Sequence, residues 1–219
     1  MMMQKEREDI VRVGKLLYER GLVQLCGGNI SVRGEGGRIA IKPSGMAYID
    51  ATPEDIVIID MEGNVLEGSG KPSIETPMHT AIYKARPDIN AIVHCHPPYA
   101  VAWSLKGKKC LHCVIVAMHM LGGAVMVAPY ESAGSAGLAR GAVEAIGERY
   151  ACILQAHGVV AGSPKDVYHA MEQCFVVEDA AKISAVAESI PGETFYIDEQ
   201  LACEAGAESP ARIREADKA

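Results

Sequence analysis

Two hydrophobic periods alternate along the chain and divide it into predicted helices and strands. Between residues 4 and 20 the apolar positions recur at helical spacing, which predicts an amphipathic helix that ends at Gly21. Short apolar runs bounded by glycine, proline or polar residues predict strands. The predicted strands cover residues 29–33, 38–42, 56–60, 91–96, 125–129, 151–155 and 159–161, and one more follows the turn that begins at residue 61. The predicted helices cover residues 4–20, 75–85, a short stretch after residue 98, 134–150 and 165–189.

The order of these elements predicts the architecture. Hairpin-spaced strands come first, and strands and helices then alternate without the regular rhythm of a doubly wound fold. We therefore expect an α/β sandwich in which helices cover a mixed, largely antiparallel sheet. The sequence contains no linker or repeat, so we expect one domain over residues 1–219, with a core at about 5–190 and a C-terminal tail at about 192–219.

Composition and charge narrow the class of protein. The chain has 219 residues, of which 49% are hydrophobic, and this is enough for one full core. A formal net charge of −7 argues against non-specific binding to nucleic acid or to anionic membranes, because both need basic patches. The first residues lack the pattern of a signal peptide, and no apolar run is long enough to span a bilayer. We therefore expect a cytoplasmic protein.

Seven cysteines, an odd number, are compatible with that compartment. Several, such as Cys152 and Cys174, lie within apolar runs, which favours reduced and buried thiols over disulfides. Cys110 and Cys113 form a CxxC pair. No second pair follows it, so a zinc or redox role for this pair is disfavoured.

Three histidines carry the strongest chemical signal. His94 and His96 stand two residues apart in a predicted strand, so both rings project from the same face and can reach one metal ion. Cys95 then faces the opposite side of the sheet. His157, from a distant segment, would complete a three-histidine set that leaves a coordination position open for chemistry, and Gly158 after it would allow a close backbone approach. The alternative is a pair of satisfied histidines on a polar sheet face.

Glu75 is the next candidate. A glutamate in the first turn of a helix is favoured by the helix dipole alone, and without further context this interpretation would suffice. Beside a metal, the carboxylate could instead ligate the ion, or leave it and transfer a proton. His79 lies one helical turn further on and could orient such a site from behind. His112, His119 and His169 have no comparable partners, and we expect them to be surface or core residues.

Three turns containing glycine or serine could bind an anion through backbone N–H groups. From spacing alone, ordinary turn chemistry is the better explanation for them. The residues concerned are Gly28, Asn29, Ser44, Gly45 and Ser73.

Together these motifs resemble the class II aldolase/adducin family, and most closely its L-fuculose-1-phosphate aldolase type. The resemblance rests on the motifs at residues 28–31, 43–45, 73–75, 94–98 and 157–158, which occur in the family's order within about residues 5–190. It implies a three-layer αβα sandwich, one Zn²⁺ per subunit, and a cyclic homotetramer with sites at subunit interfaces.

The resemblance also assigns roles to single residues. It implies that His94, His96 and His157 hold the zinc. Glu75 would be the fourth ligand in the resting enzyme and the acid/base during turnover. The substrate phosphate would be bound by Gly28, Asn29, Ser44, Gly45 and Ser73.

The reaction implied by the resemblance is the cleavage of a ketose 1-phosphate into dihydroxyacetone phosphate and an aldehyde. Zinc would stabilise the enediolate that forms as the C3–C4 bond breaks, and Glu75 would return a proton to carbon. Candidate substrates are the 1-phosphates of fuculose, ribulose, 5-deoxyribulose and methylthioribulose.

The sequence departs from the aldolase pattern in three places. That pattern has one tyrosine after the metal-binding strand and another in the C-terminal tail, but residues 108–123 and the stretch beyond Tyr196 contain none. Met118 or His119 are candidates for the first of these places. Ile74 stands where the pattern has a second phosphate-binding serine. The aldehyde end of the substrate is therefore not predicted.

Other functions stay open on the sequence. A dehydratase for methylthioribulose 1-phosphate, or a decarboxylase, would use the same zinc and glutamate. A related 4-epimerase is disfavoured because it carries aspartate at the position of Glu75. A non-catalytic scaffold like the adducin head domain is expected to have lost zinc ligands, and all of them are present here.

Overall fold

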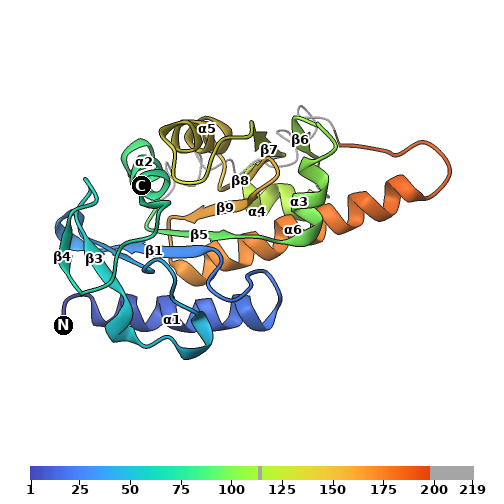
Figure 1. Ribbon diagram of the computed structural model, residues 1–219. Coiled ribbons are helices and arrows are strands. Elements are labelled where there is room, and N and C mark those ends of the chain that lie inside the picture. Colours follow the sequence, from blue (N-terminus) through green and yellow to red (C-terminus); the bar gives the residue numbers. More distant parts are fainter. Residues whose placement is uncertain (113–114, 198–219) are drawn as a thin grey trace.

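A nine-stranded sheet lies between two layers of helices in the computed structural model, which describes residues 1–112 and 115–197 (Figure 1). The strands are β1 (Asn29–Arg33), β2 (Ile39–Ile41), β3 (Val57–Ile59), β4 (Val65–Glu67), β5 (Ala91–Cys95), β6 (Cys110–Leu111), β7 (Val125–Ala128), β8 (Ala151–Leu154) and β9 (Gly158–Ser163). The helices are α1 (Gln4–Glu19), α2 (Thr76–Ala85), α3 (Pro98–Ser104), α4 (Ile115–Leu121), α5 (Ala136–Ile146) and α6 (Val167–Ser189).

The sheet runs in the order β4-β3-β2-β1-β5-β9-β8-β7-β6. Among the described strands, β7 and β8 are parallel and the other neighbours are antiparallel. β5 lies in the middle, between β1 and β9, and all five of its residues are buried. The predicted mixed, largely antiparallel sheet is confirmed.

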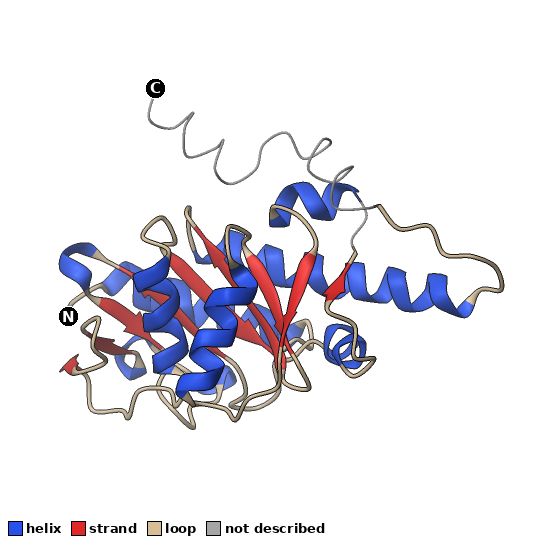
Figure 2. Cartoon of the chain, turned by 90° about the horizontal axis from the view of Figure 1, so that it is seen from above, coloured by secondary structure: helices blue, strands red, loops and turns tan. Residues whose placement is uncertain are grey.

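Alternation along the strands divides the core into two halves. The half of the core that packs against α1 and α6 contains Ile30, Val93 and Cys95. Ile92 and Val160 belong to the other half, under α2 and α5. Figure 2, turned to look down on the molecule, shows helices lying across the strands. The fold is therefore a three-layer αβα sandwich, and Cys95 faces away from the α2 side as expected.

The structure adds short elements that the pattern did not predict. β6 has two residues and α4 has seven, so neither is long enough to show a clear hydrophobic period. The helix predicted at 134–150 is shorter at both ends, because it starts after the N-cap Ser135 and stops before Gly147, whose φ is +48°.

Several predictions concern the thiols, the domain and the tail. Cys95, Cys152 and Cys174 are buried free thiols, which confirms the expectation for them. Cys113, and the predicted tail from residue 198 on, lie outside the described residues. The single domain over residues 1–219 stays a prediction.

Within residues 1–112 and 115–197, no helix combines the length and the apolar character needed to cross a membrane.

Candidate active site

The three predicted histidines meet at one end of the central strands. His94 lies near the end of β5, and His96 follows it. His157 comes from the turn before β9, and it reaches the same place because Cys95 pairs with Val159 across the two strands. The ring nitrogens of the three residues lie within 4.8 Å of one another, and in the described part of the chain they form a group that could hold a metal ion.

Hydrogen bonding fixes the orientation of the most buried ring. Nδ1 of His94 lies 2.9 Å from the carbonyl oxygen of Val159, and because that oxygen only accepts, Nδ1 carries the hydrogen. Nε2 is then left with its lone pair, and it lies 3.1 Å from Nε2 of His96. Burial and the neighbouring rings lower the pKa of His94 well below its usual value, and burial lowers the pKa of His96 as well. Both rings are therefore neutral at pH 7, which is the state that binds a metal.

Glu75 completes the cluster. It is the residue before the first turn of α2, and its side chain is 5% exposed. Oε2 lies 3.1 Å from Nε2 of His94, and Oε1 lies 3.3 Å from Nε2 of His157. Oε1 is buried and receives no hydrogen bond from the described residues. A carboxylate with one buried oxygen that lacks a donor, beside the Nε2 lone pair of His94, fits a divalent cation, whose ligands are neutral histidines and carboxylates.

The predicted anion-binding turns gather beside this cluster. The backbone N–H of Ser44 donates to the carbonyl of Lys71 at 2.8 Å, which holds the turn at residues 43–45 against the segment that leads to Ser73. Ser73 in turn accepts from the backbone N–H of Glu75 at 3.3 Å. The turn before β1 is pressed against β5, since a Cβ on Gly28 would lie 2.6 Å from the carbonyl oxygen of His94.

Asn29 makes a contact that the sequence did not predict. Its Nδ2 donates to Oε2 of Glu75 at 2.7 Å, and its Oδ1 lies 2.5 Å from Nε2 of His79. One amide hydrogen is therefore used by the glutamate, and the second hydrogen on the same nitrogen is the one left for a ligand. The side chain of Asn29 links the glutamate to the turns.

Lys42 is a residue that sequence reasoning missed. It is 2% exposed, and its ammonium group donates to the carbonyl of Cys26 at 2.8 Å and to its neighbour Pro43 at 3.4 Å. Burial lowers its pKa to about 8. The only signal was a lysine that ends an apolar strand directly before the turn at residues 43–45. The ammonium group of Lys42 places a positive charge between the turn that precedes β1 and the turn that follows β2.

The other histidines lie apart from the cluster. His169 pairs with Asp166 at 2.8 Å where α6 begins, and His119 is exposed at the end of α4. The ring of His112 is tilted against the ring of Tyr196, with 5.4 Å between centroids. The prediction for these three residues is a surface or core position, and the structure leaves His119 exposed and His112 and His169 partly buried.

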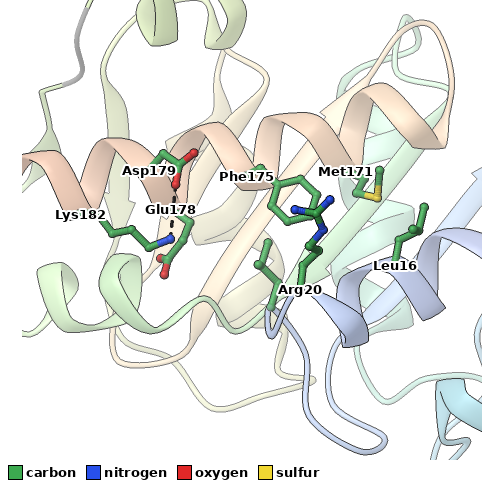
Figure 3. Close-up of a pocket in the computed structure, with 8 residues that line it drawn as sticks. Leu16, Arg20, Met171, Phe175, Glu178, Asp179 and Lys182 are labelled. Carbon is green, nitrogen blue, oxygen red and sulfur yellow. Dashed lines mark hydrogen bonds and ion pairs between the residues drawn. The ribbon is translucent and has the colours of Figure 1, made fainter.

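A hollow of about 520 Å³ lies in the other helical layer, between α1 and α6 (Figure 3). Three of its charged groups have partners within the fold: Lys182 lies 3.3 Å from Asp179, and Glu178 accepts from the backbone N–H of Tyr99 at 3.0 Å. None of the predicted site residues lines it.

The fold is an αβα sandwich whose histidine cluster could hold a metal ion, and comparison with known proteins gives the family. Residues 8–185 match the family described as class II aldolase and adducin N-terminal domain, so the chain belongs to the class II aldolase/adducin family. This confirms the resemblance seen in the sequence.

Two curated relatives are named as aldolases. The chain is 44% identical to a 5-deoxy-D-ribulose 1-phosphate aldolase from Bacillus thuringiensis over 164 residues, which are 74% of this chain and 76% of that protein. It is 35% identical to an L-fuculose phosphate aldolase from Methanococcus maripaludis over 178 residues, 81% of this chain and 95% of that protein.

Solved structures agree with the sequence relatives. An L-fuculose 1-phosphate aldolase superposes with a TM-score of 0.88 at 32% identity, covering 95% of this chain and 97% of that one. The L-fuculose-1-phosphate aldolase from Thermus thermophilus gives 0.75 at 29% identity, covering 86% of this chain and 98% of that one. The chain is a class II aldolase, and enzymes of this class depend on a metal ion.

Proposed function

We propose that this chain is a zinc-dependent lyase that cleaves a ketose 1-phosphate into dihydroxyacetone phosphate and an aldehyde. One observation carries the proposal: Asn29, which follows the candidate anion-binding turn before β1, donates a hydrogen bond to Glu75. A carboxylate held between three histidines and a phosphate-type turn suits a substrate that bears both a metal-chelating oxygen pair and a phosphate.

His94, His96, His157 and Glu75 would hold the ion. When bound, zinc supplies Lewis-acid stabilisation of the negative charge that develops on the substrate oxygens during cleavage. The histidines contribute neutral nitrogens, and the hydrogen bond from His94 to Val159 fixes which nitrogen faces the site. Nitrogen and carboxylate donors fit zinc, but other divalent transition metals accept the same set.

Glu75 would move the proton. Its Oε2 is held by the amide of Asn29, whereas its Oε1 is buried without a donor among the described residues. Oε1 is therefore the oxygen we assign to proton transfer with the substrate carbon. A carboxylate shielded from water exchanges a proton with substrate rather than with solvent.

The turns would bind the phosphate. Gly28, Asn29, Ser44, Gly45 and Ser73 are assigned to this role. The second amide hydrogen of Asn29 would point to the phosphate, so the same side chain would contact both phosphate and base. The positive φ values of Gly28 (+66°) and Gly45 (+75°) are compatible with backbone N–H groups turned toward an anion.

The substrate is inferred from the relatives and from the sequence. The relatives named above favour 5-deoxyribulose 1-phosphate and fuculose 1-phosphate, and they favour cleavage over dehydration or decarboxylation. The two missing tyrosines, one at residues 108–123 and one beyond Tyr196, fit an aldehyde with few hydroxyl groups to bind. We further propose a cytoplasmic homotetramer with sites at subunit interfaces, an assembly that rests on the family resemblance.

The test is the release of dihydroxyacetone phosphate by purified, zinc-loaded protein from a panel of ketose 1-phosphates, with and without EDTA. Release that stops with EDTA and returns with zinc is expected, and the best substrate identifies the aldehyde. Each sugar is also offered without its phosphate. Equal use of both forms would overturn the phosphate assignment, and no release from any zinc-loaded sample would overturn the lyase assignment.

A further inference from the structure

A line of buried polar side chains runs from Glu75 away from the cluster and into the space between β1 and α2. Asn29 contacts Glu75, His79 contacts Asn29, Ser31 contacts His79, and Tyr83 contacts Ser31. The four successive distances are 2.7, 2.5, 2.7 and 2.8 Å. Each of the five residues is at least nine-tenths buried. We name this line the Glu75–Tyr83 chain.

The chemistry of the carboxylate sets the direction of the inner hydrogen bonds. An ionised carboxylate only accepts, so Asn29 must turn its Nδ2 toward Glu75. Its Oδ1 then faces Nε2 of His79 and needs a hydrogen from it. Nε2 of His79 therefore carries the hydrogen, and the tautomer of this ring follows from its hydrogen-bond partners.

The outer hydrogen bonds follow from that tautomer. His79 is fully buried, and burial lowers its pKa to about 3, so the ring is neutral and its Nδ1 is an acceptor. The hydroxyl of Ser31 must donate to Nδ1, and the oxygen of Ser31 can then accept from the hydroxyl of Tyr83. Every donor in the Glu75–Tyr83 chain points toward the carboxylate, and aligned hydrogen bonds strengthen one another.

The local structure explains why the five groups line up. Asn29 and Ser31 stand two apart on β1 and project from one face of the sheet. Glu75, His79 and Tyr83 stand four apart at the start of α2 and along it, so they share the helix face that covers β1. Residues two apart on the strand therefore face residues four apart along the helix, and together they form one buried contact.

We propose that His79 is a positioning residue for Glu75: through Asn29 it fixes one carboxylate oxygen, so that the other oxygen points to the metal and the reacting carbon. The role in turnover rests on the proposed function, but the effect on metal binding does not. His79 contacts neither ion nor substrate in this assignment. It acts only by holding the amide of Asn29 in the orientation that donates to Glu75.

The experiment measures the zinc dissociation constant of the full chain in four variants. His79→Leu fills the space but removes the donor, and we expect zinc affinity to fall about 10- to 100-fold, the range seen when groups behind metal ligands are lost. His79→Gln keeps an N–H of similar reach and is expected to stay within about threefold of the native affinity. Tyr83→Phe removes only the outermost hydroxyl and should give a smaller loss than His79→Leu, because coupling falls along the chain.

Thr80→Val is the matched control. Thr80 is a buried residue of α2 next to His79, and its hydroxyl donates to backbone carbonyls of the same helix, outside the Glu75–Tyr83 chain. Its loss should leave zinc affinity unchanged. An equal loss in Thr80→Val and His79→Leu would overturn the proposal, because it would show a general effect on α2.

A double-mutant cycle separates positioning from simple destabilisation. In a Glu75→Gln background the group that His79 positions is gone, so adding His79→Leu should weaken zinc binding by less than about twofold. The full loss in that background would overturn the proposal. The single variants and the double-mutant cycle are both measured by zinc binding alone and need no substrate. If no ketose 1-phosphate is cleaved, the proposed function fails, and this cycle still decides whether His79 positions Glu75.

Discussion

Gly158 lies so close to Cys95 that a Cβ on the glycine would stand 2.3 Å from the Cys95 carbonyl oxygen. The same Cβ would lie 3.0 Å from the ring of His94 and 2.9 Å from the ring of His96. The strand that follows His157 therefore approaches the other two histidines only because residue 158 has no side chain. A single glycine in the sequence therefore sets the geometry of the histidine cluster.

Gly158→Ala should therefore disturb the cluster. The new methyl group meets backbone and imidazole atoms that cannot turn away, so we expect a loss of stability of about 1–3 kcal/mol. We also expect a loss of metal content. Urea unfolding and metal analysis of the purified protein measure the two effects. Gly162→Ala, on the same strand but against the side chain of Ile89, is the control, and it should retain metal. Full metal content in Gly158→Ala would contradict the prediction.

Glu75→Gln tests the proton-transfer role. The amide keeps the size of the side chain but cannot accept a proton, so we expect kcat to fall by about 100-fold or more. Steady-state rates with the best ketose 1-phosphate, at saturating zinc and with bound metal quantified in the same samples, measure the effect. Near-normal turnover by metal-loaded Glu75→Gln would exclude Glu75 as the acid/base.

The fold could be predicted because most of its elements are long enough to show a hydrophobic period. α1 and α6 each extend for sixteen residues or more, and the central strand β5 is a run of apolar residues interrupted only by His94. β6 and α4 were not predicted, because elements of two and seven residues are too short to show a hydrophobic period.

The cluster could be anticipated for a similar reason. His94 and His96 lie two apart on a strand, and strand geometry alone puts them on one face. Their meeting with His157 and Glu75 depends on the pairing of β5 with β9 and on the placement of α2, which local sequence does not determine. The assignment of these residues as ligands stays a prediction.

Contacts between distant segments could not be predicted. The amide of Asn29 was expected to serve only a phosphate, yet it also donates to Glu75, which lies 46 residues away in the sequence. Lys42 carried no motif, and its burial follows from the packing of the turns around it. Both cases depend on tertiary structure, which a single sequence shows only through spacing.

The buried histidines should make the metal-free protein less stable in acid. Burial lowers the pKa of His79 to about 3 and shifts the pKa values of His94 and His96 downward as well. In the unfolded chain a histidine titrates near pH 6.5, so below that pH the unfolded state binds protons that the folded state refuses. The free energy of unfolding should therefore fall as the pH drops below about 6.5, by up to about 1.4 kcal/mol per pH unit for each such histidine.

Urea unfolding of metal-free protein at pH 7 and at pH 5 measures this slope. His79→Gln removes one of the titrating groups and should lower the difference between the two pH values. Other acid-sensitive groups act equally in both proteins, so the comparison isolates His79. The same pH dependence in both proteins would contradict the prediction of a buried neutral ring at this position.

Lys42 should contribute to phosphate binding from behind the turns. Its ammonium group, which donates a hydrogen bond to the carbonyl of Cys26, lies between the segments that carry Asn29 and Ser44. A buried charge acts strongly on an anion because little water lies between them to screen it. Lys42→Met keeps the length of the side chain but removes the charge. We expect KM for the phosphorylated substrate to rise about 10-fold, with a smaller change in kcat, since one lost charge–anion contact is worth roughly 1–2 kcal/mol.

The pH dependence of KM in the native protein gives an independent test of the charge on Lys42. The pKa of Lys42 is lowered to about 8, so the ammonium group is mostly protonated at pH 7 and loses its proton as the pH rises through 8. KM for the phosphorylated sugar should therefore rise above pH 8 in the native protein and stay flatter in Lys42→Met. Lys71→Met, at an exposed lysine beside the same turn, is the control and should leave KM unchanged. An equal increase in KM in both variants would mean that general surface charge, and not the buried ammonium group, attracts the phosphate.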